Sequence, residues 1–325
     1  MKLYFPVINL LRGIAALLVA IYHFTNFSFH DVFIFQEHPW LLSIGEIGLQ
    51  GVYIFFVISG VVIPVSLYSG GFKSSAFHRY IARRWVRIEI PYIATIGLVM
   101  LIAAFFAWKN QEAFVFEPLR LLHHLSYTVP FTDYDWYNVI FWTLAIEFQY
   151  YLIIGLLYPL LSSRTKWIML VALLLFGCSV LLVPNDKFVF YFAPIFTLGI
   201  LVFLRKSERL SGFEQWGFSL LMIPLILYYH GITVTVFAAL TALVITFVTV
   251  QKGNYWLGDV SYSFYLTHGL IGGNVLYLLV RFSDNFWAKL GMVLLALILS
   301  MVFAHFFWKW IEDPARKLSK RIKIN

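Results

Sequence analysis

The chain lacks much of the chemistry that soluble enzymes use to fold and to bind. Its 325 residues include one cysteine, Cys178, so an intrachain disulfide and a cysteine metal cluster are excluded. Charged residues make up only 12% of the chain. It has no glycine-rich phosphate loop, no Gly-x-Ser-x-Gly nucleophile turn and no His/Cys set at metal-ligand spacing. We therefore expect neither a P-loop enzyme, nor a serine hydrolase of that type, nor a metal site.

The chain is rich in hydrophobic residues. They account for 61% of the chain, and the mean hydropathy is +0.81. They form long runs, which are typical of membrane helices. We predict an all-α, polytopic membrane protein with one domain over residues 1–325, about ten membrane spans and a basic interfacial helix. The predicted spans are 7–29, 44–68, 91–108, 139–161, 166–183, 188–204, 213–229, 231–250, 255–280 and 285–311.

The positive charge follows the predicted membrane topology. The net charge is +8, which could indicate a nucleic-acid partner. Nineteen of the 24 basic residues, Lys2 and Lys252 among them, fall at the termini or in loops on the same side of the membrane. Cytoplasmic loops carry such an excess of Lys and Arg. We therefore expect a lipid bilayer and no nucleic acid as the partner, with both termini cytoplasmic.

Two ionisable side chains fall inside predicted spans. In "LRGIAALLVAIYHF", His23 follows Arg12 by eleven residues, which in a helix places it about 16 Å deeper on the same face. By the same rise per residue, Glu147 of "FWTLAIEFQYYL" lies about 12 Å and His23 about 14 Å below the opposite boundary. We therefore predict that they pair, which lowers the cost of burying either. Such a pair fits a histidine base oriented by a carboxylate, and equally a proton relay in a transporter.

A basic segment, residues 69–90, precedes the third span. In a helix, Arg83 and Arg84 lie four and three residues before Arg87, so the three guanidiniums share one side. Guanidinium groups match phosphate oxygens. The segment therefore indicates a cytoplasmic phosphate site, such as one for a nucleotide-bearing acyl donor, or an interfacial helix that holds anionic lipid headgroups.

Two further sets are candidates for substrate binding. The span 255–280 carries a polar stripe at helical spacing, which can also serve to bond neighbouring helices. The acidic and aromatic segment 109–138 offers carboxylates and rings suited to a sugar, or is a solvated loop. The two sets are Ser261, Tyr265 and His268, and Asp133, Asp135, Trp136 and Tyr137.

Small residues in the span 44–68 predict close helix packing. These residues are Gly51, Ser59 and Gly60, and small side chains let the backbones of two membrane helices approach each other.

Six segments, taken in order from residue 11 to 314, resemble the acyltransferase-3 family of bacterial membrane O-acyltransferases. They are "LRGIAALLVAIYHF", "GVYIFFVISGVVI", "RRWVRIEIPY", "WTLAIEFQYYL", "LGDVSYSFYLTH" and "WIEDP". The resemblance implies a ten-helix domain in the bacterial inner membrane. Such a domain takes an acyl group, usually acetyl, from cytosolic acyl-coenzyme A and passes it to a sugar hydroxyl of a surface or lipid-linked glycan.

The resemblance also implies roles for single residues. His23 matches the catalytic histidine, Arg12 its motif partner and Glu147 the buried acid, and Arg84 and Arg87 match an Arg-x-x-Arg pair. Together with the basic segment, this leads us to expect Arg12, Arg83, Arg84 and Arg87 at the acyl-coenzyme A donor. The donor is a substrate, and no permanently bound cofactor is expected. No soluble esterase-like domain is expected after the last span. The alternative function is a secondary transporter or glycan-intermediate translocator that uses His23 and Glu147 as a proton relay.

Overall fold

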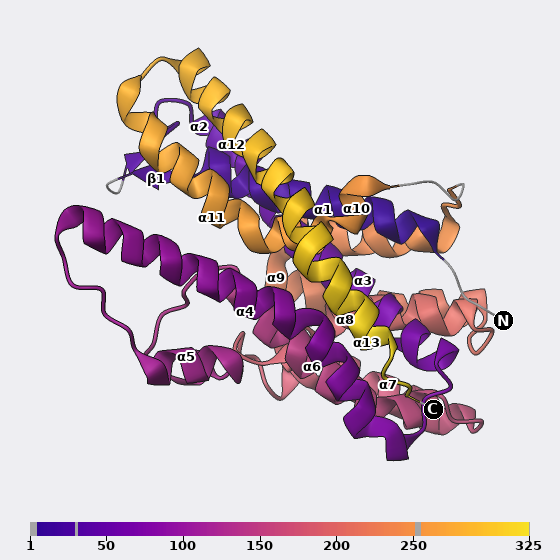
Figure 1. The fold of residues 1–325 in the computed structure, drawn as a ribbon. Helices are drawn as coiled ribbons and strands as arrows, with labels where there is room; N and C mark the ends of the chain where they lie inside the picture. Colours follow the sequence, from indigo (N-terminus) through magenta and orange to yellow (C-terminus); the bar gives the residue numbers. More distant parts are fainter. Residues whose placement is uncertain (1–4, 30–31, 251–254, 325) are drawn as a thin grey trace.

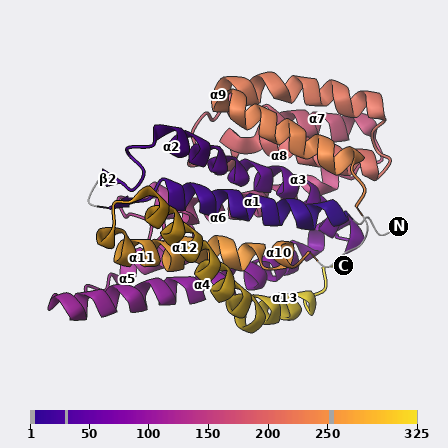
Figure 2. The same cartoon turned by 90° about the horizontal axis from the view of Figure 1, so that it is seen from above.

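The computed structural model describes residues 5–29, 32–250 and 255–324, so Lys2 and Lys252 lie outside the described residues. It is a bundle of helices in which the start of α1 (Pro6–Thr25) and the last helix, α13 (Asp313–Lys320), lie at the same end (Figures 1 and 2). We call this the terminal end and the opposite one the far end. The strands among the described residues are β1 (Ser28–Phe29) and β2 (Val32–Phe33), which form one short antiparallel pair. The all-α prediction is therefore confirmed.

The other long helices are α3 (Gln50–Ser69), α4 (Phe77–Asn110), α6 (Phe141–Leu161), α8 (Val189–Lys206), α9 (Gly212–Phe247), α11 (Ser261–Leu279) and α12 (Phe286–Phe307). The shorter helices are α2 (Pro39–Glu46), α5 (Pro118–Leu125), α7 (Lys166–Gly177) and α10 (Trp256–Asp259). Single 3₁₀ turns are η1 (Ile47–Leu49), η2 (Ser74–Ala76), η3 (Val129–Phe131), η4 (Ser179–Leu181) and η5 (Val280–Phe282), and η6 (Trp308–Glu312) is a π-helical turn.

Eight helical segments of the described chain are long and apolar enough to cross a membrane. One of them, α9, is a hairpin of two helices. Gly231 interrupts it with φ 81° and ψ 175°, a backbone conformation that favours glycine. The two halves run antiparallel, because Gln215 near its start donates a hydrogen bond of 3.1 Å to Thr246 near its end. This confirms that 213–229 and 231–250 are separate helices.

The predicted span 166–183 contains a shorter helix. α7 has twelve residues, about 18 Å at 1.5 Å per residue, compared with a hydrocarbon core of about 30 Å. The 3₁₀ turn η4 follows it before the chain enters α8. α7 and the two halves of α9 bring the eight segments to the ten apolar helices that the sequence predicts.

The basic interfacial helix and the third span are one continuous helix. α4 has 34 residues, about 51 Å, which exceeds the thickness of the hydrocarbon core. Pro91 lies inside it, at the predicted start of the span, without ending it. The sequence analysis divided this helix at Pro91, whereas the structure shows it to be continuous, so the arginines of the basic segment stand on the first turns of the helix whose later part is the predicted span.

Close helix contacts set the position of α3. A Cβ on Gly60 would lie 2.2 Å from the carbonyl oxygen of Phe196 in α8, and a Cβ on Gly51 would lie 2.3 Å from that of Ala15 in α1. The predicted packing role of these two glycines is confirmed. α8 is buried at every residue from 192 to 204, as expected for a helix that is hydrophobic all round. Ser59 does not pack in this way, because its side chain faces a cavity.

Candidate active site

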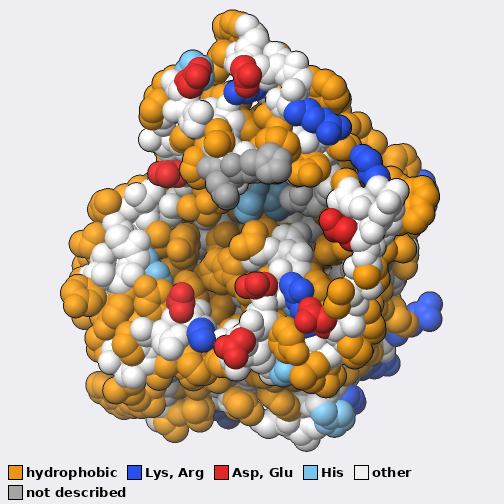
Figure 3. All heavy atoms as spheres, turned by 90° about the vertical axis from the view of Figure 1, so that its left-hand side faces the viewer, with side chains coloured by type: hydrophobic (Ala, Val, Ile, Leu, Met, Phe, Trp, Pro, Cys, Tyr) orange, Lys and Arg blue, Asp and Glu red, His pale blue; other side chains and the backbone are white. Residues whose placement is uncertain are grey.

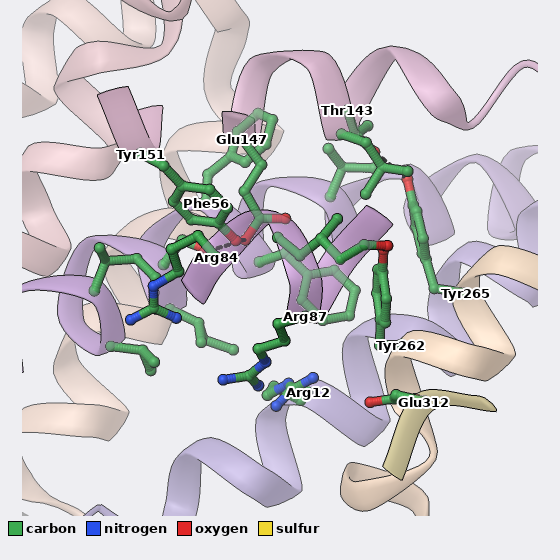
Figure 4. Close-up of a pocket in the computed structure, with 18 residues that line it drawn as sticks. Arg12, Phe56, Arg84, Arg87, Thr143, Glu147, Tyr151, Tyr262, Tyr265 and Glu312 are labelled. Atoms are coloured by element: carbon green, nitrogen blue, oxygen red, sulfur yellow. Dashed lines mark hydrogen bonds between the residues drawn. The ribbon is translucent and has the colours of Figure 1, made fainter. Parts of the chain in front are cut away.

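A cavity of about 900 Å³, including its mouth, opens among α1, α3, α4, α6, α11 and η6 (Figure 4). We call it the arginine cavity. Its polar lining residues are Arg12, Ser59, Arg84, Arg87, Thr143, Glu147, Tyr151, Tyr262, Tyr265 and Glu312. Arg12 lies in the second turn of α1 and the other two arginines in the first turns of α4, so the cavity belongs to the terminal half of the bundle.

The three guanidiniums of the arginine cavity, those of Arg12, Arg84 and Arg87, form no ion pair within the described part of the chain. Arg84 is 5% exposed, and its guanidinium lies 5.7 Å from the ring centre of Tyr151. Its Nε is buried and has no hydrogen-bond acceptor among the residues that the structure describes. Because a buried donor without an acceptor is costly, the site suits an anionic ligand with several oxygen atoms.

Two carboxylates face the same cavity and are held apart. Glu147 accepts a hydrogen bond from Ser59 Oγ at 3.1 Å and another from the hydroxyl of Tyr151. Glu312 accepts from the backbone N–H of Ser263 at 3.0 Å and from its Oγ at 2.6 Å. Even with both carboxylates ionised, three guanidiniums leave the cavity with a positive charge.

His23 lies in the other half of the bundle, on two further cavities. The far-end cavity, of about 700 Å³ including its mouth, lies between α1, α4, α11 and residues 137–140. The linking cavity, of about 710 Å³, extends from His23 to Tyr265 and Val52, both of which also line the arginine cavity. Figure 3 shows the far-end face, which is hollowed at its centre with histidine atoms inside the hollow. His23 therefore stands between an entrance from the far end and the wall of the arginine cavity.

The comparison with known proteins decides the family. The sequence model of the acyltransferase-3 family, described as "Acyltransferase domain", matches residues 5–305. The chain belongs to the acyltransferase-3 family. Over 332 residues it is 26% identical to "Putative acetyltransferase ORF330" of Acidianus two-tailed virus, with 91% of this chain and 94% of that protein covered. No solved structure matches the chain significantly.

In this acyltransferase, His23 and Glu147 do not form the predicted pair. The hydrogen bonds of Glu147 go to Ser59 and Tyr151, and Nδ1 of His23 lies 2.9 Å from the carbonyl oxygen of Val19 and 3.3 Å from Nε2 of His268. Equal depth gives only the level of a side chain along the membrane normal. It does not show which helices are neighbours. His23 belongs to α1 and Glu147 to α6, and α3 packs against both of these helices. The prediction of a direct contact was therefore wrong.

The remaining arginine of the basic segment lies apart from the cavity. Arg84 and Arg87 line the arginine cavity, whereas Arg83 does not. One helical step of about 100° separates neighbouring residues, so Arg83 and Arg84 cannot point the same way. We expected Arg83 at the donor site because it lies four residues before Arg87, about one turn of a helix.

The polar stripe of α11 divides into three different environments. Tyr265 lies between the arginine cavity and the linking cavity, and its hydroxyl lies 2.8 Å from Thr143 Oγ. His268 is fully buried against His23. Ser261 donates to the carbonyl oxygen of Gly258 at 2.7 Å and lines none of the three cavities.

Of the four candidate residues in the acidic and aromatic segment 109–138, one lines a cavity. Tyr137 lines the far-end cavity, whereas Asp133 and Asp135 are exposed and line none of the three cavities. The ring of Trp136 packs edge-on against His124, with 5.5 Å between the ring centres. The two aspartates therefore do not share a site with His23.

Sequence reasoning missed Glu312, although it lies in the quoted "WIEDP" segment. The residue is 5% exposed and belongs to the π-helical turn that joins α12 to α13. Such turns often occur at functional sites because they change the direction of a side chain within a helix. The signal in the sequence was an acidic residue directly after the predicted span 285–311.

Proposed function

We propose that this protein is an integral membrane O-acyltransferase that transfers an acyl group, typically acetyl, from acyl-coenzyme A to a hydroxyl group of a glycan. The single observation that carries the proposal is the arrangement of the cavities. Three arginines that form no ion pair with any described residue line one cavity, and His23 lines two others. Tyr265 lines both the arginine cavity and the linking cavity.

The arginine cavity is the proposed site of the donor. Coenzyme A carries phosphate groups at one end and the reactive thioester at the end of a long flexible arm. Arg12, Arg84 and Arg87 would bind the phosphates, because guanidinium forks bond phosphate oxygens in pairs. The arm would then extend past Tyr265 toward His23.

His23 is the proposed general base. Its Nε2 would take the proton of the acceptor hydroxyl while the hydroxyl oxygen attacks the thioester carbonyl carbon. The carbon–sulfur bond breaks, and the acyl group stays on the acceptor oxygen as an ester. The thiolate of coenzyme A leaves and takes up the proton that His23 accepted, which returns His23 to its neutral form. Glu147 lines the arginine cavity, so it would contact the bound donor and not His23.

The acceptor would enter from the far end. Asn138, Asn274 and Tyr137 line the far-end cavity and could form hydrogen bonds with hydroxyl groups of the acceptor. Gly269 and Gly273 of α11 also line it, and because they have no side chain they leave space for the acceptor. Aspartates 133 and 135 would contact only the outer parts of a long glycan. The terminal end would then be cytoplasmic, where acyl-coenzyme A is found, as the positive-inside bias predicts.

The proton-relay alternative needs a proton path between His23 and Glu147. In the described structure these two side chains share no hydrogen bond, and each has other partners. This arrangement favours the transferase.

The proposal is tested in membranes of the source organism in which the gene has been deleted and then restored. Acetyl-coenzyme A labelled in its acetyl group is added to inverted vesicles, and the label in the glycan fraction is measured. We expect label in the glycan only when the gene is present, and mass spectrometry of the glycan should show the ester. Equal labelling with and without the gene would refute the proposal.

A further inference from the structure

The side chain of His23 contacts a second histidine. Nε2 of His268 lies 3.3 Å from Nδ1 of His23, and the ring centres are 5.1 Å apart. The two residues come from α1 and α11 and are 245 positions apart in the chain. Their contact therefore depends on the tertiary fold.

The hydrogen bonds of His268 determine where its proton lies. Its Nδ1 lies 2.7 Å from the carbonyl oxygen of Tyr265 and 3.2 Å from that of Phe264. A carbonyl oxygen can only accept, so Nδ1 of His268 must carry the hydrogen and donate it. In a neutral imidazole the other nitrogen is then an acceptor. Nε2 of His268 therefore presents a lone pair to His23.

The same reasoning assigns the tautomer of His23. Its Nδ1 faces two acceptors, the carbonyl oxygen of Val19 at 2.9 Å and Nε2 of His268 at 3.3 Å. Nδ1 of His23 therefore carries the hydrogen, and its Nε2 is left with a free lone pair. A general base needs a free lone pair of this kind to take the proton of a hydroxyl group.

His268 is held rigidly and has no access to the cavities. It is fully buried and lines none of the three cavities. The rings of Phe24, Phe264 and Tyr265 surround it, with centres 5.9 to 6.0 Å from its own. A residue in this position cannot contact substrate, but it can fix the orientation of a residue that does.

We propose that His268 is the positioning residue of the catalytic histidine: it holds His23 with the proton on Nδ1 and the lone pair of Nε2 free for the acceptor. When His23 takes the acceptor proton it becomes an imidazolium, and its Nδ1–H donates a charge-assisted hydrogen bond to His268. His268 thus has the orienting role that the sequence analysis assigned to Glu147, and it adds no second charge inside the membrane. This inference rests on the proposed function.

Two substitutions separate the acceptor role of His268 from its packing. In His268→Gln the side-chain amide reaches the position of Nε2, so its oxygen can still accept from His23. In His268→Asn the amide reaches only the position of Nδ1, so the bond to Tyr265 can persist while the acceptor for His23 is lost. His305→Asn serves as the control, because His305 accepts a hydrogen bond from Trp256 Nε1 and lines none of the three cavities.

The transfer of labelled acetyl groups is measured in the vesicles described above over a range of acetyl-coenzyme A concentrations. We expect His268→Asn to lower kcat about 100-fold with the KM for acetyl-coenzyme A unchanged, since general-base catalysis supplies about 100-fold or more. His268→Gln should stay within about tenfold of the wild type, and His305→Asn should match it.

Two results would contradict the inference, and they differ from a failure of the proposed function. If the wild type transfers acetyl groups, equal losses of kcat in His268→Gln and His268→Asn would overturn the positioning role alone. Full activity of His268→Asn would overturn it as well. No transfer by the wild type would overturn the proposed function and this inference with it.

Discussion

The hydroxyl groups of Tyr265 and Thr143 lie 2.8 Å apart at the wall between the arginine cavity and the linking cavity. Both residues line the arginine cavity, and Tyr265 also lines the cavity that leads to His23. In the proposed mechanism, the acyl group of a donor bound among the arginines passes this hydrogen-bonded pair on its way to His23.

The size of the side chain at position 265 should therefore control transfer. Tyr265→Trp places a larger ring in the passage, so we expect transfer to fall by more than about tenfold, because small displacements of the reacting atoms cost this much. The KM for acetyl-coenzyme A should change little, since the arginines are untouched. Tyr265→Phe keeps the ring and should keep the rate. A wild-type rate in Tyr265→Trp would show that the acyl group takes another route.

Removal of a cavity arginine should weaken donor binding. Arg84→Ala and Arg87→Ala each remove hydrogen bonds to charged oxygens that persist throughout the reaction, each worth about 1.5–3 kcal/mol. The KM for acetyl-coenzyme A should therefore rise about tenfold to 100-fold with little loss of kcat. Lysine in place of either arginine should recover only part, because the paired fork is lost.

Arg83→Ala is the matched control for these variants. Arg83 is the neighbour of Arg84 on α4, but it does not line the cavity. Its replacement should leave the donor KM within about twofold of the wild type. If Arg83→Ala and Arg84→Ala raised the KM equally, a general surface charge and not the cavity would bind the donor.

Residues 126–140 at the far end should become less stable in acid, because His124 is protonated there. Nδ1 of this buried residue lies 2.9 Å from the carbonyl oxygen of Arg120, and its Nε2 accepts from the backbone N–H of Tyr137 at 2.9 Å. Burial, with the nearby charges of Arg120 and His123, lowers the pKa of His124 below its ordinary 6.5. A depressed histidine pKa gives stability that is complete above about pH 6.5 and is lost as the pH falls toward the folded-state pKa.

Hydrogen exchange of residues 126–140 checks this expectation. Protection, corrected for intrinsic exchange rates, should decrease between pH 7.5 and pH 5 in the wild type. It should not change in His124→Gln, whose amide oxygen can still accept from Tyr137 and does not titrate. Equal protection of the wild type at both pH values would rule out this role of His124.

The sequence predicts the helices of this protein better than their contacts. Apolar runs about 20 residues long define membrane helices directly, and the two runs around Gly231 correctly indicated a hairpin. Helical spacing also placed Arg84 and Arg87 together. Both features depend only on residues close to one another in the chain.

The contacts between helices could not be derived in this way. The depth of a residue follows from its position in a span, but its partner depends on which helices are neighbours and how they are rotated. His23 therefore received Glu147 as a predicted partner, although its contact is His268. Glu312 was overlooked because a π-helical turn, which local spacing does not reveal, directs it into the cavity.

The most direct test of the central claim is acetyl transfer by His23→Ala, measured in the same membranes together with the binding of acetyl-coenzyme A. His23 lies outside the arginine cavity, so the donor should still bind with wild-type affinity. Without the base, transfer to the glycan should fall by at least about 100-fold. Wild-type transfer by His23→Ala would contradict the account.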